Sequence, residues 1–546
     1  MMKRVALLLA LTVMACSDGE SECTDNDGDG VTTCAGDCDD SDPTTYAGAT
    51  EICGDGIANT CSGAAELGCD ALGTFVSAKI GSDANPGTRE LPVATIGAAL
   101  TNAVTIGRYP ATIILGEGVY TQKVELVNGV SLSGGYQCDV AACTWQRDIF
   151  AYDSVIVDVD LEGVVAHAGV TSETVLDGVM VVGSDGTGVV GAAITLDGGS
   201  PTLRASRFHG GTVTGDAVAV LVRSTTDAAG VTIYGNEIIG GRATATSAGV
   251  VLAGANATTL ALVAGNTIRG GDGARSVGLL AANTVDGTLV QHNDIFTGNA
   301  SGGTADGIVA SSTLVIDANR VNAVRDLVGT CTGTMGFCSG ITSFSATATI
   351  TNNIAFGANG PRTAGVVLAE AERPGGDIVL NSNLLDGGGV AGAGTSAALV
   401  VAIGGCTSCG FTGIIGRVRN NVLVGGSSSE RFGILEAPAQ GKTVRPELIE
   451  NNAIWFAPSA ATTNVLYRQV PGSGQPIDIV DIAALNALAV PQASANLATN
   501  PLYDATWHEL DGSPCANAGT ALEAPTRDFD NQQRTGAIDI GPDEAF

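Results

Sequence analysis

The sequence predicts an all-β protein: a parallel β-helix solenoid, preceded by a short capping helix and a small acidic, cysteine-rich module. Composition is the first reason, because 76 of the 546 residues are glycine and 45% are hydrophobic, whereas only 15% are charged and 4% aromatic. This much glycine disfavours a helical bundle, and this many aliphatic residues exclude a disordered acidic chain. A regularly recurring asparagine is the second reason, and the lack of amphipathic helices between its recurrences is the third.

The first fifteen residues have the pattern of an export signal. Lys3 and Arg4 precede an apolar stretch over residues 5–13, which is too short to cross a bilayer. Val13-Met14-Ala15-Cys16 resembles a bacterial lipobox, in which the cysteine is acylated after cleavage. We therefore expect residues 1–15 to be removed, Cys16 to be lipidated and residues 16–24 to act as a linker. The protein would be anchored by lipid to the outer membrane, in the periplasm or at the surface; an ordinary signal peptide with an incidental cysteine is the alternative.

An acidic module is predicted over residues 25–70. Residues 17–70 contain fourteen Asp or Glu and no Lys or Arg, and the whole chain has a net charge of −31, which argues against nucleic acid as a partner. The phrase DNDGDG at residues 25–30 alternates carboxylates before a glycine, a spacing that folds several oxygens around a hard cation such as Ca²⁺. The candidate metal ligands are Asp25, Asp27, Asp29, the carbonyl group of Val31, Asp37, Asp39, Asp40 and Asp42.

Residues 25–63 resemble the metal-binding repeat of MopE-like bacterial surface proteins and are similar to thrombospondin type 3 calcium repeats. The matching phrases are DNDGDG, GDCDDSDP, GATEIC and DGI. The resemblance implies a structural Ca²⁺ ion, without which such a module does not fold. Near the end of the repeat only Asn59 keeps a ligand type, because Ala58 and Thr60 occupy positions that are usually acidic or amide. A solvated acidic linker is the alternative interpretation.

Fourteen cysteines fit an oxidising compartment. Six lie in or beside the acidic module, at Cys23, Cys34, Cys38, Cys53, Cys61 and Cys69. Three further pairs are close in the sequence and favour local disulfides: Cys138 with Cys143, Cys331 with Cys338, and Cys406 with Cys409. Cys515 remains, and we expect it to be a buried free thiol.

Residues 74–136 are predicted to form the N-terminal cap and the first coils. Thr95 can cap a short helix in which Ile96, Ala99, Leu100 and Ala103 share one face. The phrases GSDANPGT and TIGAAL resemble the DUF1565-type opening of right-handed parallel β-helix proteins of the pectate-lyase-like superfamily. The resemblance implies a right-handed solenoid whose first coil is covered by this helix.

Residues 137–470 are predicted to form the parallel β-helix itself. Asparagines recur here at intervals of 26 to 38 residues, each between two short apolar segments: Asn236, Asn266, Asn293, Asn319, Asn353, Asn383, Asn421 and Asn452. Because asparagine tolerates the left-handed conformation at a bend and can hydrogen-bond along a stack, we expect these eight residues to be structural.

Residues 471–546 are predicted to be a C-terminal cap region. The phrases NPL, GSP and DIG resemble the usual ending of the same superfamily. Pro542 and Asp543 stand where that ending has Ala-Tyr before its glutamate, here Glu544.

The sequence identifies no catalytic residue. The superfamily that it resembles includes lyases, hydrolases, epimerases and adhesins, but the phrases typical of polygalacturonases are missing from the sequence. Asp158, Asp160 and Glu162 are predicted to share the outer face of one strand, where a sugar or Ca²⁺ would bind, although a solvated face is the plainer interpretation. Asp177 is predicted to be a turn residue, and none of the four histidines has a partner at triad or metal-ligand spacing.

We therefore expect a non-catalytic protein of the cell envelope that binds polysaccharide or extracellular matrix, or that serves as a structural stalk. The alternative is a calcium-dependent polysaccharide lyase or glycoside hydrolase with a divergent active site. It stays open because a solenoid assembles a site from residues about 30 positions apart.

Overall fold

The computed structural model describes most of the chain after residue 24. The described residues are 25, 27–49, 57–62, 73–107, 109–139, 143–224, 230–254, 260–282, 284, 286–324, 327–333, 336–345, 347–370, 376–390, 392–403, 412–438, 442–458 and 463–544. The predicted export signal, Cys16 and its linker, and the pair Cys406 and Cys409 lie outside them. Within the described part of the chain, no helix is long and apolar enough to cross a membrane.

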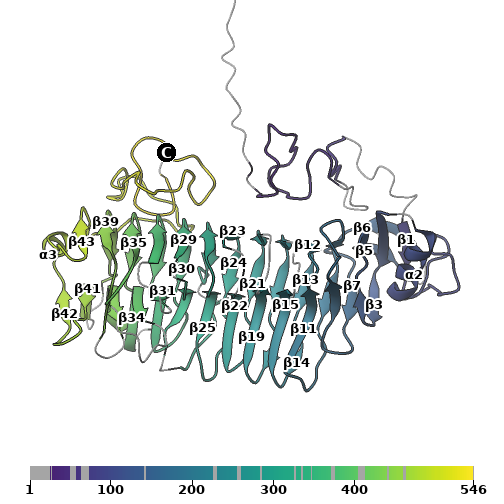
Figure 1. Ribbon diagram of the computed structural model, residues 1–546, viewed down its shortest axis with the longest axis horizontal. Helices are drawn as coiled ribbons and strands as arrows, with labels where there is room; N and C mark the ends of the chain where they lie inside the picture. Colours follow the sequence, from purple (N-terminus) through teal and green to yellow (C-terminus); the bar gives the residue numbers. More distant parts are fainter. Residues whose placement is uncertain are drawn as a thin grey trace, which may run out of the picture. The chain divides into compact units, whose positions relative to one another are not determined.

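The chain divides into two compact units. The first comprises Met1–Glu51 with Ile57–Ala65, and the second comprises Ile52–Gly56 with Glu66–Phe546. The second unit is a stack of coils in which most coils contribute a strand to each of three parallel sheets (Figure 1). The all-β parallel β-helix predicted from the sequence is therefore confirmed.

The first sheet contains the strand of each coil that precedes the asparagine bend. In order it consists of β1 (Gly73–Val76), β2 (Ala111–Gly116), β5 (Val130–Cys138), β9 (Val175–Asp177), β12 (Thr202–Arg204), β16 (Thr232–Tyr234), β20 (Leu262–Ala264), β23 (Thr288–Gln291), β26 (Leu314–Asp317), β29 (Thr347–Thr351), β32 (Gly376–Asn381), β35 (Thr412–Arg419), β39 (Leu448–Glu450) and β43 (Gln492–Ser494). Beside this row, β6 (Cys143–Arg147) pairs antiparallel with β5, and β38 (Thr443–Arg445) pairs parallel with β35.

The second sheet contains the strand that follows the bend. In order it consists of β3 (Gly118–Thr121), β7 (Ser154–Val157), β10 (Met180–Val182), β13 (Arg207–His209), β17 (Glu237–Ile239), β21 (Thr267–Arg269), β24 (Asp294–Phe296), β27 (Arg320–Val321), β30 (Ile354–Phe356), β33 (Leu384–Asp386), β36 (Val422–Val424) and β40 (Ala453–Trp455).

The third sheet contains the longest strands. In order it consists of β4 (Val124–Glu125), β8 (Val164–His167), β11 (Val190–Asp197), β15 (Asp216–Ser224), β19 (Thr246–Gly254), β22 (Arg275–Ala281), β25 (Ala305–Ala310), β28 (Cys338–Ser343), β31 (Arg362–Glu370), β34 (Gly392–Ile403), β37 (Ser428–Ala437), β41 (Thr463–Gln469) and the antiparallel β42 (Ile477–Ile479). A short pair, β14 (Thr212–Val213) and β18 (Arg242–Ala243), lies between the second and third sheets in the sequence.

The core is made of aliphatic side chains stacked in register from coil to coil. Val250, Leu279, Ile308 and Ile341 pair in parallel from β19 to β28, and each is fully buried. Because each strand hydrogen-bonds to the same strand of the next coil, a β-branched or leucine side chain at one position lies directly over its equivalent. Burying such a side chain contributes about 1.5–3 kcal/mol, so the solenoid is stabilised along its whole length.

Two short helices lie at opposite ends of the stack (Figure 1). In α2 (Ile96–Ile106), Thr95 accepts a hydrogen bond from the N–H of Ala98 at 3.1 Å, and the predicted face is buried: Ile96, Ala99, Leu100 and Ala103. In α3 (Ile482–Asn486), Asp481 is the N-cap and Leu485 joins the hydrophobic core. Both helices therefore cover apolar side chains at the ends of the solenoid.

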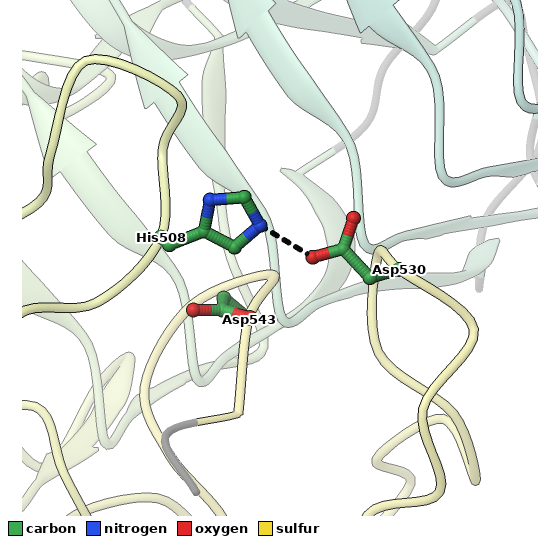
Figure 2. Close-up of side chains that lie close together, drawn as sticks. All are labelled: His508, Asp530 and Asp543. Atoms are coloured by element: carbon green, nitrogen blue, oxygen red, sulfur yellow. Dashed lines mark hydrogen bonds and ion pairs between the residues drawn. The ribbon is translucent and has the colours of Figure 1, made fainter.

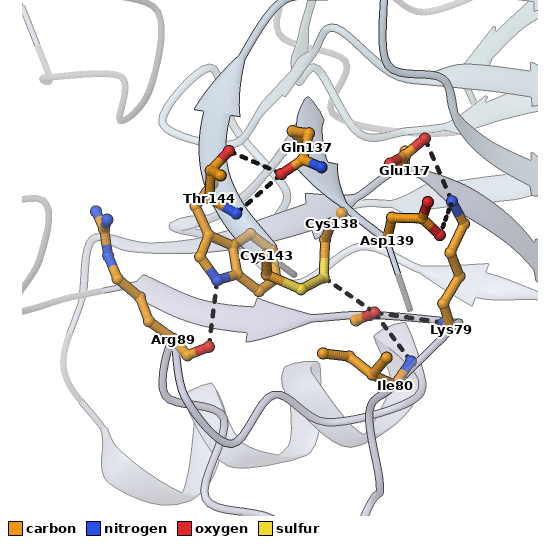
Figure 3. The surroundings of a disulfide bond; sticks show 12 residues. Lys79, Ile80, Arg89, Glu117, Gln137, Cys138, Asp139, Cys143 and Thr144 are labelled. Carbon is orange, nitrogen blue, oxygen red and sulfur yellow. Dashed lines mark hydrogen bonds and ion pairs between the residues drawn. A yellow bond between two sulfur atoms is a disulfide. The ribbon is translucent and has the colours of Figure 1, made fainter. Parts of the chain in front are cut away.

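A disulfide and a set of polar contacts fasten the first coils (Figure 3). Cys138 and Cys143 join β5 to β6, and the Sγ atom of Cys138 lies 3.2 Å from Oγ of Ser77. The indole N–H of Trp145 donates to the carbonyl of Arg89 at 3.2 Å. Cys331 and Cys338 form a second local disulfide, as the sequence predicts.

The recurring asparagines form a ladder between the first and second sheets. Each is at most 3% exposed, and its side-chain N–H₂ group donates to the Oδ1 atom of the next asparagine at 2.9–3.1 Å, from Asn236 through Asn266, Asn293, Asn319, Asn353, Asn383 and Asn421 to Asn452. Asn452 continues it to Asn496, and Asn496 to Asn486 of α3. The sequence pattern misses these last two because their spacings, 44 and 10 residues, leave the repeat.

The ladder asparagines do not themselves take the left-handed conformation that the sequence argument assigned to them. The preceding residue does so instead, for example Gly235 (φ 62°), His292 (φ 50°) and Asn352 (φ 54°). The physical reason is that two residues have separate roles at each bend. The first takes the left-handed conformation, and the second, the asparagine, points its amide inward and donates to buried backbone carbonyls.

Residues 500–544 contain no helix or strand and pack against the outer side of the second sheet. Cys515 is fully buried there as a free thiol, with Ile540, against Phe356, Val422 and Ala453. Side-chain amides on successive coils donate to carbonyl groups of this segment: Asn352 to Arg527 at 3.0 Å, Asn381 to Glu523 at 2.7 Å, Asn420 to Thr520 at 2.8 Å and Asn451 to Ala518 at 2.9 Å. We call residues 500–544 the C-terminal cover.

Candidate metal centre

In the first unit, the carboxylates of the first acidic run, residues 25–30, accept hydrogen bonds from backbone amides of the same loop. The carboxylate of Asp25 accepts the N–H groups of Gly28 and Gly30 at 2.8 and 3.1 Å, and Asp29 accepts that of Val31 at 2.6 Å. Gly28 and Gly30 both have positive φ, which lets the chain turn back so tightly. As a result, one carboxylate oxygen from each of Asp25, Asp27 and Asp29 lies within 4.8 Å of the other two.

Several of these carboxylate oxygens are buried without a partner. Asp27 is 4% and Asp37 is 7% exposed, and the Oδ2 atoms of Asp27, Asp29 and Asp37 have no hydrogen-bond partner. Burial, aided by the neighbouring carboxylates and opposed by hydrogen bonds from their own loop, raises the pKa of Asp27 to about 7 and that of Asp29 to about 6. Unpaired buried carboxylate oxygens are costly, and a divalent cation supplies the partner that they lack. The residues present therefore fit a metal ion.

In the second acidic run, residues 37–42, only some of the aspartates lie near the group formed by Asp25, Asp27 and Asp29. Asp37 and Asp40 lie close enough to raise the pKa of Asp29 electrostatically. Asp39 and Asp42 instead hold local turns: Asp39 accepts the hydroxyl of Ser41 at 2.6 Å, and Asp42 accepts that of Thr44 at 2.7 Å. The ligand roles of Asp39, Asp40 and Asp42, and of the Val31 carbonyl, remain predictions.

The end of the module is tied back to the second acidic run. The disulfide between Cys38 and Cys61 spans 23 residues, and Asn59 is fully buried with its side-chain amide donating to Oγ1 of Thr45 at 3.1 Å. Gly36 has a φ of +109°, and a Cβ atom there would lie 2.8 Å from that of Ala47. These contacts hold the second run in a fixed loop.

The acids Asp158, Asp160 and Glu162 do not share a strand face, so that prediction is wrong. Strand β7 ends at Val157, and the next residues form a turn in which Asp158 is 3% exposed and accepts the hydroxyl of Ser184 at 2.8 Å. Asp160 and Glu162 point to solvent instead, where the Nζ atom of Lys123 lies 3.4 and 2.9 Å from them. Alternation failed here because it holds only within a continuous strand.

Asp177 is not a turn residue but the buried centre of an ion-pair triad. It ends β9 and is 1% exposed, and its two carboxylate oxygens lie 2.8 Å from Arg147 and 3.0 Å from Arg204. Burial alone would raise the pKa of Asp177, but Arg204 and Arg147 outweigh it and lower that pKa. Since the triad is closed to solvent, its role is structural.

One charged group was missed by the sequence argument. His508 lies beside Asp530 and Asp543, which are 22 and 35 residues away. No motif spacing would reveal this group, because three separate turns of the C-terminal cover bring it together.

Comparisons with known proteins agree with a metal site in the first unit. The MopE copper-binding family, described as "Putative metal-binding motif", matches residues 37–66. The match covers the second acidic run and Cys61, and it confirms the predicted metal-binding repeat. Comparison with curated proteins finds no match.

Solved structures similar to this chain include three with low identity. The A-module of mannuronan C-5 epimerase AlgE4 from Azotobacter vinelandii is 14% identical, with a TM-score of 0.38, over 68% of this chain and 92% of that one. XylC in complex with xylose is 10% identical, with a TM-score of 0.39, over 86% and 98%. Pectate lyase Pel9A is 12% identical, with a TM-score of 0.37, over 86% and 96%.

Proposed function

We propose that this protein is an exported component of the cell envelope, anchored by lipid at Cys16 to the outer membrane. Its first unit holds Ca²⁺ for structural purposes, and its β-helix binds polysaccharide or extracellular matrix without cleaving it. The observation that carries the non-catalytic part is that the central charged groups of two solenoid clusters, Lys123 and Asp177, are held in ion pairs. The membrane part is tested by fractionation: Cys16→Ser should move the protein from the membrane fraction to the soluble one, and an unchanged distribution would contradict the anchor.

The charged clusters of the solenoid support binding rather than catalysis. The hydrogen bond from Lys123 to Glu162 raises the pKa of the lysine, despite partial burial, so Lys123 is a protonated cation and not a base. The carboxylate of Asp177 is held by two arginines and closed to solvent. Acid–base catalysis needs a group that gains or loses a proton near the working pH and that touches the substrate. Neither cluster provides one.

The donor set favours Ca²⁺ over copper in the first unit. Residues 17–70 contain no histidine or methionine, and Cys34, Cys38 and Cys61 are in disulfides. Among the described residues of this unit the remaining donors are oxygens, which suit a hard cation, whereas copper prefers nitrogen and sulfur. In calorimetric titrations of the chain from residue 17 onward, Ca²⁺ should bind and Asp27→Asn should weaken it at least tenfold. Glu173→Gln, an exposed acid of the solenoid, is the control, and Cu²⁺ binding that Asp27→Asn abolishes and that Ca²⁺ does not displace would refute the assignment.

Binding by the β-helix is tested by affinity electrophoresis in gels containing alginate, polygalacturonate or xylan. We expect at least one polymer to retard the protein, and the retardation to persist in Asp27→Asn if the solenoid carries the binding surface. Equal mobility in all gels, including one that contains matrix proteins, would contradict a binding function.

A calcium-dependent lyase or hydrolase is the second candidate, and one observation favours it. Glu125, Asp160 and Glu162 come from neighbouring parts of the first coils and surround Lys123 within 3.7 Å. A lyase needs such acids beside a lysine on adjacent coils, and here the substrate would have to displace Glu162 before Lys123 could act as a base. Cleavage that is abolished by Lys123→Ala would establish this candidate.

A further inference from the structure

The C-terminal cover brings one histidine and two aspartates to a single point (Figure 2). The Nε2 atom of His508 lies 2.7 Å from Oδ2 of Asp530, and one ligand atom from each of His508, Asp530 and Asp543 lies within 4.8 Å of the other two. The three side chains come from separate turns, which are held together by a hydrogen bond from the N–H of Phe529 to the carbonyl of Pro542 at 2.8 Å.

The hydrogen bonds around His508 assign the protonation of its ring. The hydroxyl oxygen of Thr506 lies 2.8 Å from Nδ1 of His508 and 2.8 Å from a carboxylate oxygen of Asp504. A carboxylate only accepts, so the single hydroxyl hydrogen goes to Asp504, and Thr506 accepts from the Nδ1–H group. Nε2 then faces the carboxylate of Asp530 at 2.7 Å, and this contact needs a cation at Nε2: a proton donated to Asp530, or in its place a metal ion bound to the lone pair.

A metal-bound histidine has this arrangement, since its second ring nitrogen donates to a polar partner and fixes the ring. The chain of Asp504, Thr506 and His508 is such a support, with the ligating nitrogen turned toward two carboxylates.

A buried, unpartnered carboxylate beside the group is the second observation. Asp528 is 2% exposed, and its Oδ2 atom has no hydrogen-bond partner. It belongs to the same turn as Asp530, whose N–H it accepts through Oδ1 at 3.0 Å, and it interacts electrostatically with Arg534 as well as with Asp543 and Asp530. Asp543 is itself 6% exposed, and it accepts the N–H of Glu509 at 2.8 Å.

The nearby arginine is engaged elsewhere. Arg534 is buried, where it pairs with Glu544 at 2.6 Å and donates to the carbonyls of Gly541 and Pro542 at 2.9 Å. Three carboxylates, those of Asp504, Asp530 and Asp543, thus lie around one imidazole, and a divalent cation would offset this excess of negative charge.

We propose that His508, Asp530 and Asp543 form a second metal site, which takes a transition-metal dication of the Zn²⁺ class and clips the C-terminal cover together. One imidazole nitrogen with carboxylate oxygens suits Zn²⁺ or Co²⁺, whereas Ca²⁺ prefers oxygen alone. The side chains of His508 and Asp530 are 47% and 30% exposed, so the ion can enter from solvent and complete its coordination with water.

The site is tested with Co²⁺, whose visible absorption reports its coordination. The chain from residue 17 onward is stripped of transition metals, saturated with Ca²⁺ to fill the first unit, and titrated with Co²⁺ and then with Zn²⁺ as a competitor. We expect one equivalent of Co²⁺ to bind and Zn²⁺ to displace it. His508→Ala and Asp543→Asn should each weaken binding at least tenfold, whereas His167→Ala, an exposed histidine of β8, should leave it unchanged.

Folding of the variants is followed independently. Asp543→Asn keeps an oxygen to accept the Glu509 N–H group, and Cys515 stays unreactive toward a thiol reagent as long as the cover remains docked. Zn²⁺ should also slow proteolysis within residues 500–544 of the unaltered chain. Absence of a Co²⁺ spectrum in that chain, or equal Co²⁺ binding by a docked His508→Ala variant, would overturn the proposal.

Discussion

Single polar side chains decide how the coils of this solenoid stack. Each ladder asparagine serves two neighbouring coils, because it accepts from the asparagine below and donates to the one above while it also satisfies backbone carbonyls. A buried amide that is fully hydrogen-bonded specifies one register, whereas a half-satisfied one is costly. The residue before each ladder asparagine takes the left-handed conformation that bends the chain, so each of these turns depends on two adjacent residues.

Replacing one ladder asparagine should therefore lower the free energy of unfolding substantially. In Asn353→Ala, the backbone N–H and side-chain amide of Asn319 lose their acceptor, and the carbonyls of Ile316 and Thr351 lose a donor. We expect the free energy of unfolding to fall by at least about 3 kcal/mol, since each buried group left without a partner costs about 1–3 kcal/mol. Urea unfolding measures this loss, and Asn299→Ala at an exposed position is the control. A loss no larger than in the control would show that the ladder is dispensable.

The ion-pair triad around Asp177 makes the stability of the folded protein depend on pH in the acidic range. Its pKa is lowered in the folded state, so its stabilising contribution is complete above the unfolded pKa of about 3.9 and disappears as the pH falls through the lower, folded value. Asp177→Asn leaves Arg147 and Arg204 buried without their counter-charge and should cost about 3–5 kcal/mol at pH 7. The difference in the free energy of unfolding between the Asp177→Asn variant and the parent protein should become smaller below pH 4. A gap that stays constant down to pH 2 would argue against this ion-pair account.

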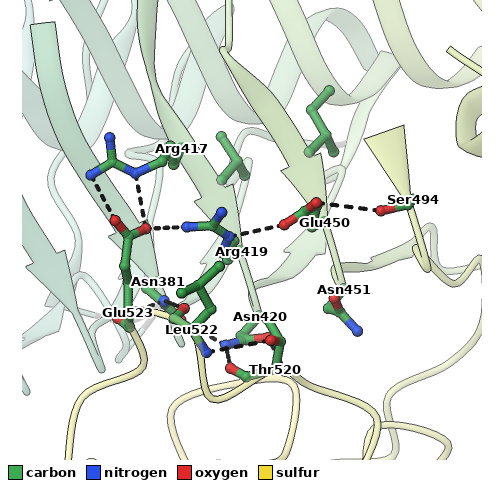
Figure 4. Close-up of polar contacts among 12 residues, drawn as sticks. Asn381, Arg417, Arg419, Asn420, Glu450, Asn451, Ser494, Thr520, Leu522 and Glu523 are labelled. Carbon is green, nitrogen blue, oxygen red and sulfur yellow. Dashed lines mark hydrogen bonds and ion pairs between the residues drawn. The ribbon is translucent and has the colours of Figure 1, made fainter. Parts of the chain in front are cut away.

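At the scale of elements, the C-terminal cover is a long segment held without secondary structure. Besides four side-chain amides, it is held by Glu523, whose carboxylate binds Arg417 at 2.9 Å and also Arg419 (Figure 4). Arg419 in turn bonds Glu450 at 3.0 Å. Such a segment opens locally more easily than a strand does, because its backbone hydrogen bonds lie mostly within the segment itself, as from Arg534 to Thr526, and not to the sheets of the solenoid.

Glu523→Ala should loosen the cover while the solenoid stays folded. Cys515 beneath it is fully buried, so its reaction with a thiol reagent, located by peptide mass spectrometry, reports opening of the cover. We expect this reaction to be at least tenfold faster in Glu523→Ala. Glu447→Ala also removes a carboxylate near Arg417, at 3.7 Å, but lies outside the cover and should react like the parent. Equal rates in all three proteins would contradict the role of Glu523.

The sequence predicts the helices and strands far better than it predicts groups of side chains that come from turns far apart in the chain. Glycine content and the asparagine interval indicate the solenoid, and the cap of α2 is visible in Thr95 and the apolar face behind it. The prediction for Asp158, Asp160 and Glu162 is wrong because β7 ends at Val157, before the first of them. The group at His508 could not be found, because its members join through tertiary packing of irregular turns, which leaves no period in the sequence.

At the scale of the whole molecule, the two units are separately compact, so metal in the first should leave the second unaffected. Removing Ca²⁺ with EGTA should abolish hydrogen-exchange protection of amides in residues 27–49, because the carboxylates there repel one another without a cation. Protection in strands such as β19 and β22 should not change. Loss of protection in the solenoid on Ca²⁺ removal would contradict this independence, and unchanged protection in residues 27–49 would contradict a structural metal.

The central claim is that the β-helix binds its partner without cleaving it. The most direct test is to incubate the Ca²⁺-loaded chain from residue 17 onward with a panel of acidic and neutral polysaccharides and to measure new reducing ends, which both lyases and hydrolases create. Our account predicts no release above that of a heat-denatured control on any polymer, including those that retard the protein in gels. Release that requires Ca²⁺ and is lost in Lys123→Ala would contradict it and would make the protein an enzyme.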